Sequence, residues 1–246
     1  TFVAKVLTTP ANDMWYPTYD ELLAEGVFTR ASLGGETAGL ATRRNSREAV
    51  ISLLMSYAPA ISERYPNDFD TLVDSLWKQI QEGHTDGEIG VIIRQQVAMF
   101  TLKLLPIVDD ETLLSYHNYQ SAVFDELQDI SAVACVELFF PTGKPLNVAS
   151  LLSDRTVKLE QEVLANVVQA SDTKNRENFS QQESAELMNN VIDQLTYDQL
   201  TFLSSEQLRS EAPGDACNAV IDFLNAFSNI SLDLRARTLR AMYSGG

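Results

Sequence analysis

The spacing of apolar residues constrains this chain most strongly, because from about residue 45 onward they recur at helical intervals. Between Asp68 and Glu82 they fall at steps of three and four, and Gly83 follows as a stop signal. Strand-like alternation of apolar and polar residues is nearly absent. The pattern predicts an all-α, multi-helix bundle with helices at 19–25, 46–63, 68–82, 87–105, 110–128, 131–140, 152–170, 181–195, 197–203, 205–210, 215–228 and 232–243.

Helix starts are marked by pairs with the spacing of a capping box or a near variant, in which each side chain satisfies the other residue's free backbone N–H. The pairs are Asn45 with Glu48, Ser180 with Glu183, and Ser204 with Gln207.

Proline and polar residues indicate the joints. Pro141 and Pro145 interrupt the stretch 141–150, and a polar run covers 171–180. We expect an irregular N-terminal arm over 1–44, one helical half over 45–140 and a second over 141–246, packed closely together.

The 246 residues are 45% hydrophobic, which suffices for a buried core. The most apolar stretch, Ile89 to Leu105, is interrupted by Arg94 and Lys103, so we expect no membrane span. The chain begins at Thr1 without a methionine. Loss of a signal peptide or membrane anchor predicts an extracytoplasmic protein, and trimming of a cytoplasmic protein is the alternative.

The charge is strongly negative, with 34 acidic against 18 basic residues and a net charge of −16. No basic residue occurs between Lys103 and Lys144 or between Arg176 and Arg209. This balance excludes nucleic acid as an expected partner, because phosphate binding needs a basic surface. The acidic residues form either a face that attracts a basic partner or divalent cations, or a solvated surface.

The two cysteines, Cys135 and Cys217, stand far apart and form no CxxC motif. They are either independent buried thiols or one disulfide that joins the two helical halves. We favour the disulfide, since the count is even and each half holds one cysteine. In the chain-entropy model, closing so long a loop stabilises a fold by about 4 kcal/mol. A disulfide also implies an extracytoplasmic compartment.

The sequence lacks the residues that several enzyme mechanisms require. We interpret His84 as part of an interhelical turn and His117 as a helix-surface or partly buried residue. The stretch 34–39 has glycines spaced like a phosphate loop, but Leu40 and Ala41 stand where lysine and a hydroxyl residue are required. No G-x-S-x-G motif occurs. We expect no metal, cofactor or catalytic triad.

Paired carboxylates are the one enzymatic route left, because glycan cleavage needs two acids and no histidine. Acidic residues beside glycines or apolar neighbours are Glu36, Glu82, Glu88 and Glu137.

Two clusters near the N-terminus are candidates for interaction. Trp15, Tyr16 and Tyr19 are either binding anchors or residues that fix the arm to the helical body. The arginines that follow the glycine-rich stretch are either anion contacts or a solvated cluster, and they are Arg43, Arg44 and Arg47.

The C-terminal helix reverses the charge of the rest of the chain. Its arginines 235, 237 and 240 are accompanied by one acid, Asp233. We expect these arginines to bridge to the acidic residues of 109–137, while an apolar stripe docks the helix. The stripe comprises Leu232, Ala236, Leu239 and Met242 or Tyr243.

These features together predict a non-enzymatic, extracytoplasmic protein-interaction or envelope-associated module that binds an unidentified protein partner. The alternatives are a carboxylate-dependent cell-envelope glycan hydrolase or lyase, and a cytosolic helical regulatory protein.

Overall fold

The computed structural model describes residues 47–83, 86–142 and 146–244. Every regular element in these ranges is helical and none is a strand, which confirms the all-α class. The chain divides into Thr1–Val50 and a compact unit, Ile51–Gly246. The expected arm over 1–44 and the helix at 19–25 lie outside the described residues, and the division into halves at residue 140 stays a prediction.

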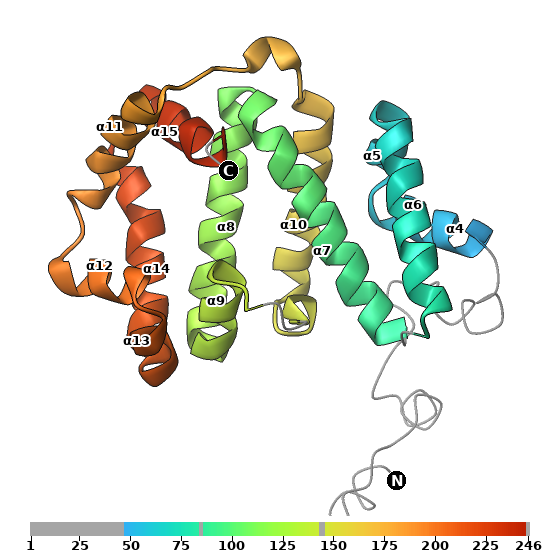
Figure 1. Cartoon of the computed structure of the whole chain (residues 1–246), viewed down its shortest axis with the longest axis horizontal. Coiled ribbons are helices and arrows are strands. Elements are labelled where there is room, and N and C mark those ends of the chain that lie inside the picture. The colour runs from blue at the N-terminus through green and yellow to red at the C-terminus, as the bar shows by residue number, and fades with distance from the viewer. Residues whose placement is uncertain (1–46, 84–85, 143–145, 245–246) are drawn as a thin grey trace, which may run out of the picture. The chain divides into compact units, whose positions relative to one another are not determined.

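The helices agree closely with the expected ranges (Figure 1). Their bounds are α4 Arg47–Tyr57, α5 Pro59–Arg64, α6 Pro66–Gln81, α7 Asp86–Leu104, α8 Asp110–Ile130, α9 Ala132–Phe139, α10 Asp154–Ala170, α11 Gln181–Ile192, α12 Tyr197–Ser204, α13 Glu206–Glu211, α14 Pro213–Ala226 and α15 Leu232–Ser244, with short 3-10 turns that include η2, Leu105–Ile107.

Proline explains the main difference from the expected boundaries. The single helix expected at 46–63 is instead two, because α4 ends at Tyr57 and α5 begins at Pro59. Proline has no N–H to donate to the preceding turn, but it fits the first turn of a new helix. Pro66 begins α6 and Pro213 begins α14 in the same way.

The capping predictions are confirmed in part. Ser180 and Glu183 form the expected reciprocal box at the start of α11. The predicted cap formed by Ser204 and Gln207 was wrong by one position, because the N-cap residue of α13 is Ser205. Asn45 lies outside the described residues.

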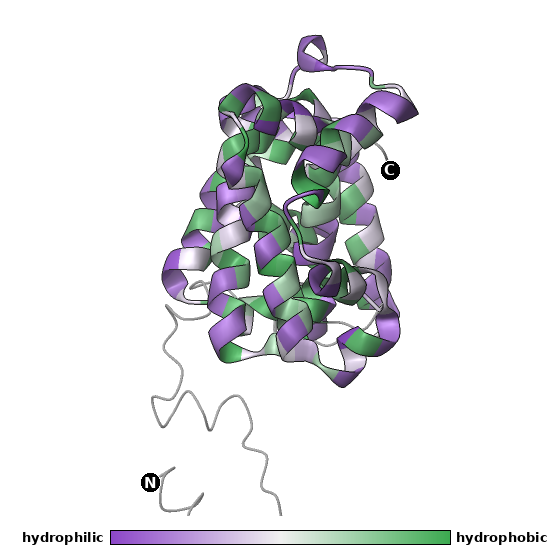
Figure 2. Cartoon of the chain, turned by 90° about the vertical axis from the view of Figure 1, so that its left-hand side faces the viewer, coloured by the Kyte–Doolittle hydropathy of each residue, from purple (hydrophilic) through white to green (hydrophobic). Residues whose placement is uncertain are grey.

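The core of Ile51–Gly246 is built around α8, which packs against α9, α10, α14 and α15. Its buried face carries Leu113, Tyr116, Val123 and Leu127, spaced to fall on one side of the helix. Figure 2 shows apolar and polar residues alternating along the same helices, as expected for amphipathic helices around a shared core.

The segment Glu88–Ile107 is long and apolar enough to cross a membrane by length and composition. It packs against α6 and α10, and it buries Ile93 and Val97 together with an Arg94–Glu160 ion pair. A core helix has the same composition, so the described residues contain no clear membrane span.

The C-terminal helix docks largely as expected. Ala236 and Leu239 are buried, whereas Leu232 is 62% exposed and does not belong to the stripe. Arg240 bridges to Asp110, within the predicted acidic stretch, with its Nη2 2.7 Å from Oδ1. Arg237 instead pairs with Glu177.

Candidate protein-binding groove

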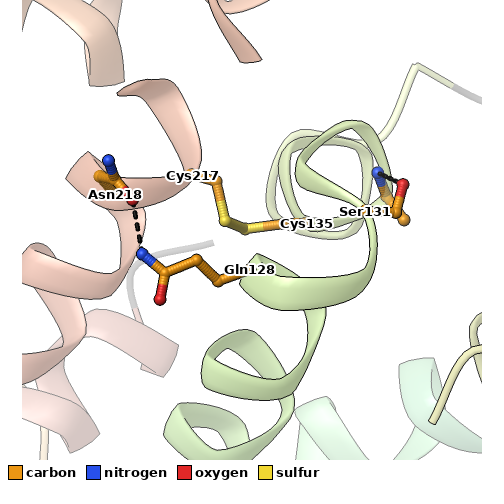
Figure 3. The surroundings of a disulfide bond; sticks show 6 residues. Gln128, Ser131, Cys135, Cys217 and Asn218 are labelled. Carbon is orange, nitrogen blue, oxygen red and sulfur yellow. Dashed lines mark hydrogen bonds between the residues drawn. A yellow bond between two sulfur atoms is a disulfide. The ribbon is translucent and has the colours of Figure 1, made fainter. Parts of the chain in front are cut away.

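A disulfide fixes the corner at which α8 ends and α9 begins (Figure 3). Ser131 caps α9 by accepting a hydrogen bond from the backbone N–H of Ala134 at 3.2 Å. One turn later the fully buried Cys135 bonds to Cys217 of α14, with 5.7 Å between their Cα atoms. The predicted pairing of these two cysteines is confirmed.

Polar and aromatic contacts reinforce this joint. Beside the disulfide, Nε2 of Gln128 donates to Oδ1 of Asn218 at 2.6 Å (Figure 3). The ring of Phe139 on α9 lies edge-on to Phe124 of α8 and Phe223 of α14, with centroids 5.7 and 5.9 Å away. Because covalent, hydrogen-bonded and aromatic contacts meet here, α9 is held firmly against α14.

An open groove of about 700 Å³ lies on this joint, between α9 with the residues that follow it and α13 with the start of α14. Most of its lining is apolar, and polar side chains occur among it. The lining residues are Val133, Val136, Glu137, Phe139, Phe140, Pro141, Thr142, Glu206, Arg209, Ser210 and Pro213.

One strongly exposed apolar side chain lines the groove on its α9 side: Val133 is 65% exposed. Among the described residues seven large apolar side chains are exposed, and Val133 alone of these lines the groove. A single exposed apolar residue needs no explanation, but one that lines a groove with mostly apolar walls is typical of an interaction surface.

Arg209 forms part of the apolar wall. Its guanidinium carbon lies 4.0 Å from the centroid of the Phe140 ring. Nη1 of the same side chain donates to the backbone carbonyl of Leu203 at 2.8 Å. The guanidinium is therefore held over the aromatic ring, a favourable cation–π arrangement.

Two carboxylates also line the groove. Oε1 of Glu137 accepts hydrogen bonds from the backbone N–H of Thr142 at 2.6 Å and from its hydroxyl at 2.8 Å. Glu206 is the other, at the first position of α13. Two carboxylates against one guanidinium give the groove lining a net negative charge, and α8 and α9 contain no lysine or arginine.

Of the residues singled out from the sequence, Cys135, Cys217 and Glu137 meet at this site. Trp15, Tyr16, Tyr19, Arg43 and Arg44 lie outside the described residues, as do Glu36 and His84. Arg47 is the first residue of α4 and does not line the groove. Glu82 is the residue that follows α6 and pairs with Lys78, and Glu88 is an exposed residue of α7. Neither joins Glu137 in lining the groove.

His117 requires a correction, because it lies neither on the surface nor partly buried. Its side chain is completely buried, and its ring centroid is 5.2 Å from that of Phe227. Burial, together with the smaller effect of the Arg235 charge, lowers the pKa of His117 to about 4. The residue is thus a neutral core side chain at physiological pH.

Within the described ranges, no group of three or more histidine, cysteine or acidic side chains could hold a metal ion. Comparisons with protein-family models, curated proteins and solved structures found no match to this chain.

Proposed function

We propose that this protein is a non-enzymatic, extracytoplasmic interaction module that binds a basic, amphipathic segment of another protein in the groove between α9 and α13. The observation that carries the proposal is an open groove with apolar walls, an exposed valine and two carboxylates. It lies on a joint that a disulfide holds in place.

The chemistry of the groove specifies the partner segment. Large apolar side chains on one face of a helix would cover Val133 and the Phe140 wall, as in other helix-in-groove complexes. Burial of apolar surface contributes about 25 cal/mol per Å². Lysine or arginine on the flanks of the segment would face Glu137 and Glu206, and the charge of −16 on the whole chain would speed the encounter.

The disulfide supports an extracytoplasmic location, which includes association with a cell envelope. Disulfides persist in oxidising compartments, whereas the cytosol keeps thiols reduced. The bond therefore favours the extracytoplasmic module over a cytosolic regulator.

The test uses two labelled peptides of about 15 residues, long enough for several helical turns. Both carry leucine at helical spacing, and the remaining positions hold lysine in one peptide and glutamate in the other. Fluorescence anisotropy should show the lysine peptide binding at least about tenfold more tightly.

Variants separate groove binding from general attraction between opposite charges. Val133→Gln and Glu206→Lys should each weaken binding of the lysine peptide about fivefold to tenfold. The matched control is Met99→Gln on α7, which removes an equally exposed apolar side chain outside the groove. Equal affinities of the Val133 and Met99 variants would refute the proposed site.

A second candidate, a carboxylate-dependent glycan hydrolase or lyase, is favoured by one observation: Glu137 and Glu206 line the same groove. Glu137→Gln distinguishes the two functions. A glycosidase loses turnover of a soluble glycan with this variant, because glycan cleavage needs both acids. An interaction module has no turnover to lose, and this variant removes only the part of its peptide affinity that the charge of Glu137 supplies.

A further inference from the structure

A second, smaller pocket, of about 300 Å³, is lined by residues of the junction between α4 and α5 and by residues of α7 and α10. Its walls are mostly apolar and include Ile61, Val97, Leu164 and Val168. All four of these side chains are buried. The volume is at the lower end of the range for small-molecule sites.

A buried ion pair lies one helical turn from these walls. Arg94 precedes Val97 by three residues on α7, and Glu160 precedes Leu164 by four on α10, so each charged residue neighbours a wall residue on its own helix. Nε of Arg94 donates to Oε1 of Glu160 at 2.8 Å, and the two side chains are 16% and 7% exposed.

One buried hydrogen-bond donor on the lining of this pocket, the hydroxyl of Tyr57, has no acceptor among the described residues. Burial raises the pKa of Tyr57, Glu160 raises it further and Arg94 opposes the rise, so the three groups lie within electrostatic reach of one another. The hydroxyl keeps its proton and remains a donor. Buried donors without acceptors are rare in folded proteins.

We propose that this pocket binds a small, neutral, largely apolar molecule that presents one acceptor oxygen, such as a ketone, ester or amide carbonyl, to the Tyr57 hydroxyl. The apolar walls select the body of the molecule and this hydroxyl selects its oxygen. A neutral molecule fits because Glu160 already balances the charge of Arg94, and the exposed Glu162 on the pocket lining repels an anion. A cation would leave the Tyr57 hydroxyl without an acceptor.

The experiment uses three probes with the same naphthalene body: acetylnaphthalene offers a neutral ketone, ethylnaphthalene offers no acceptor, and naphthoate carries a negative charge. Isothermal titration of the folded protein should show acetylnaphthalene binding about fivefold more tightly than ethylnaphthalene, and naphthoate weakest. Equal affinities for the ketone and the hydrocarbon, or no binding of either, would overturn the proposal.

Two substitutions locate the binding. Tyr57→Phe should abolish the preference for the ketone without lowering the melting temperature, because the hydroxyl it removes has no partner. Ala165→Leu, which adds bulk to a lining position, should weaken both neutral probes, with the helical fold checked by circular dichroism.

Tyr65→Phe is the matched control. The Tyr65 hydroxyl is hydrogen-bonded to Ser171 and does not line the pocket, so this variant should lose stability and keep the ketone preference. A Tyr57→Phe variant that retained the preference, or lost stability as the control does, would contradict the proposed role of this hydroxyl.

Discussion

At the scale of single residues, His117 shows how burial changes the behaviour of a titratable group. It lies within the core on α8, and its side chain is completely buried. Its folded-state pKa of about 4 lies below the ordinary value of 6.5. The unfolded chain therefore takes up a proton before the folded protein does.

The direction of the resulting pH dependence follows. The contribution of neutral His117 to the free energy of unfolding is fully present above about pH 6.5. It is lost as the pH falls towards 4, because protonation of the histidine favours the unfolded chain. We predict a loss of about 3 kcal/mol in the free energy of unfolding over this interval from this residue. Urea denaturation at a series of pH values measures it.

His117→Leu is the informative variant. It removes the titrating ring and retains an apolar side chain beside Phe227. Both proteins also lose stability at low pH through carboxylates with a lowered pKa, such as Glu126. The difference between their free energies of unfolding therefore isolates the effect of His117. Parallel pH profiles for the two proteins would show that His117 does not titrate in this way.

The sequence predicted some residues better than others. An even cysteine count, with one cysteine in each expected helical half, was sufficient to favour the Cys135–Cys217 disulfide. The burial of His117 was not predictable, since polar and aromatic neighbours surround it in the sequence and its main contact, Phe227, lies far along the chain. Local patterns carry no information about such a tertiary contact.

At the scale of elements, helix ranges were predictable because spacing and caps are local properties. The remaining errors came from prolines, as at Pro59, and from adjacent serines that compete as caps, as at Ser204 and Ser205. Docking of α15 was predictable from its arginines. Their individual partners were not, because Glu177 lies outside the acidic stretch 109–137.

The two arginines of α15 that contact Glu177 should contribute very differently to stability. Arg240 is 4% exposed and also binds Asp110 and the backbone carbonyl of Val108, whereas Arg237 is 53% exposed. Arg240→Ala should lower the free energy of unfolding by about 2 kcal/mol, because it leaves these acceptors unpaired. Arg237→Ala should cost less than about 0.5 kcal/mol.

Thermal or urea denaturation of these two variants provides the measurement, and each serves as the control for the other because both place alanine in the same helix. If the two substitutions cost the same, α15 is docked by its apolar stripe alone and the buried bridge adds no stability.

At the scale of the whole molecule, the disulfide joins segments 82 residues apart and holds the groove together. Replacing both cysteines with alanine should lower the free energy of unfolding by about 4 kcal/mol. It should also weaken binding of the lysine peptide, because α9 is then free to move from α14. Denaturant titration and anisotropy measure the two effects, and an unchanged affinity would show that the groove does not depend on the bond.

The groove could not be predicted from the sequence because it forms where α9 meets α13, two helices about seventy residues apart. The run Phe139–Phe140–Pro141 was the one local signal, since it places two aromatic residues at a helix end beside a proline. Arg209 and Glu206 are ordinary residues of a polar helix in the sequence, and they become part of the site only through packing.

Amide hydrogen exchange with and without the lysine peptide tests the central claim most directly, because it reports where on the folded protein the peptide binds. We predict slower exchange in α9, Ala132–Phe139, and in α13, Glu206–Glu211, with no change in α7 around Met99. Protection confined to other helices, or none at peptide concentrations that saturate the anisotropy signal, would contradict the claim that this groove is the binding site.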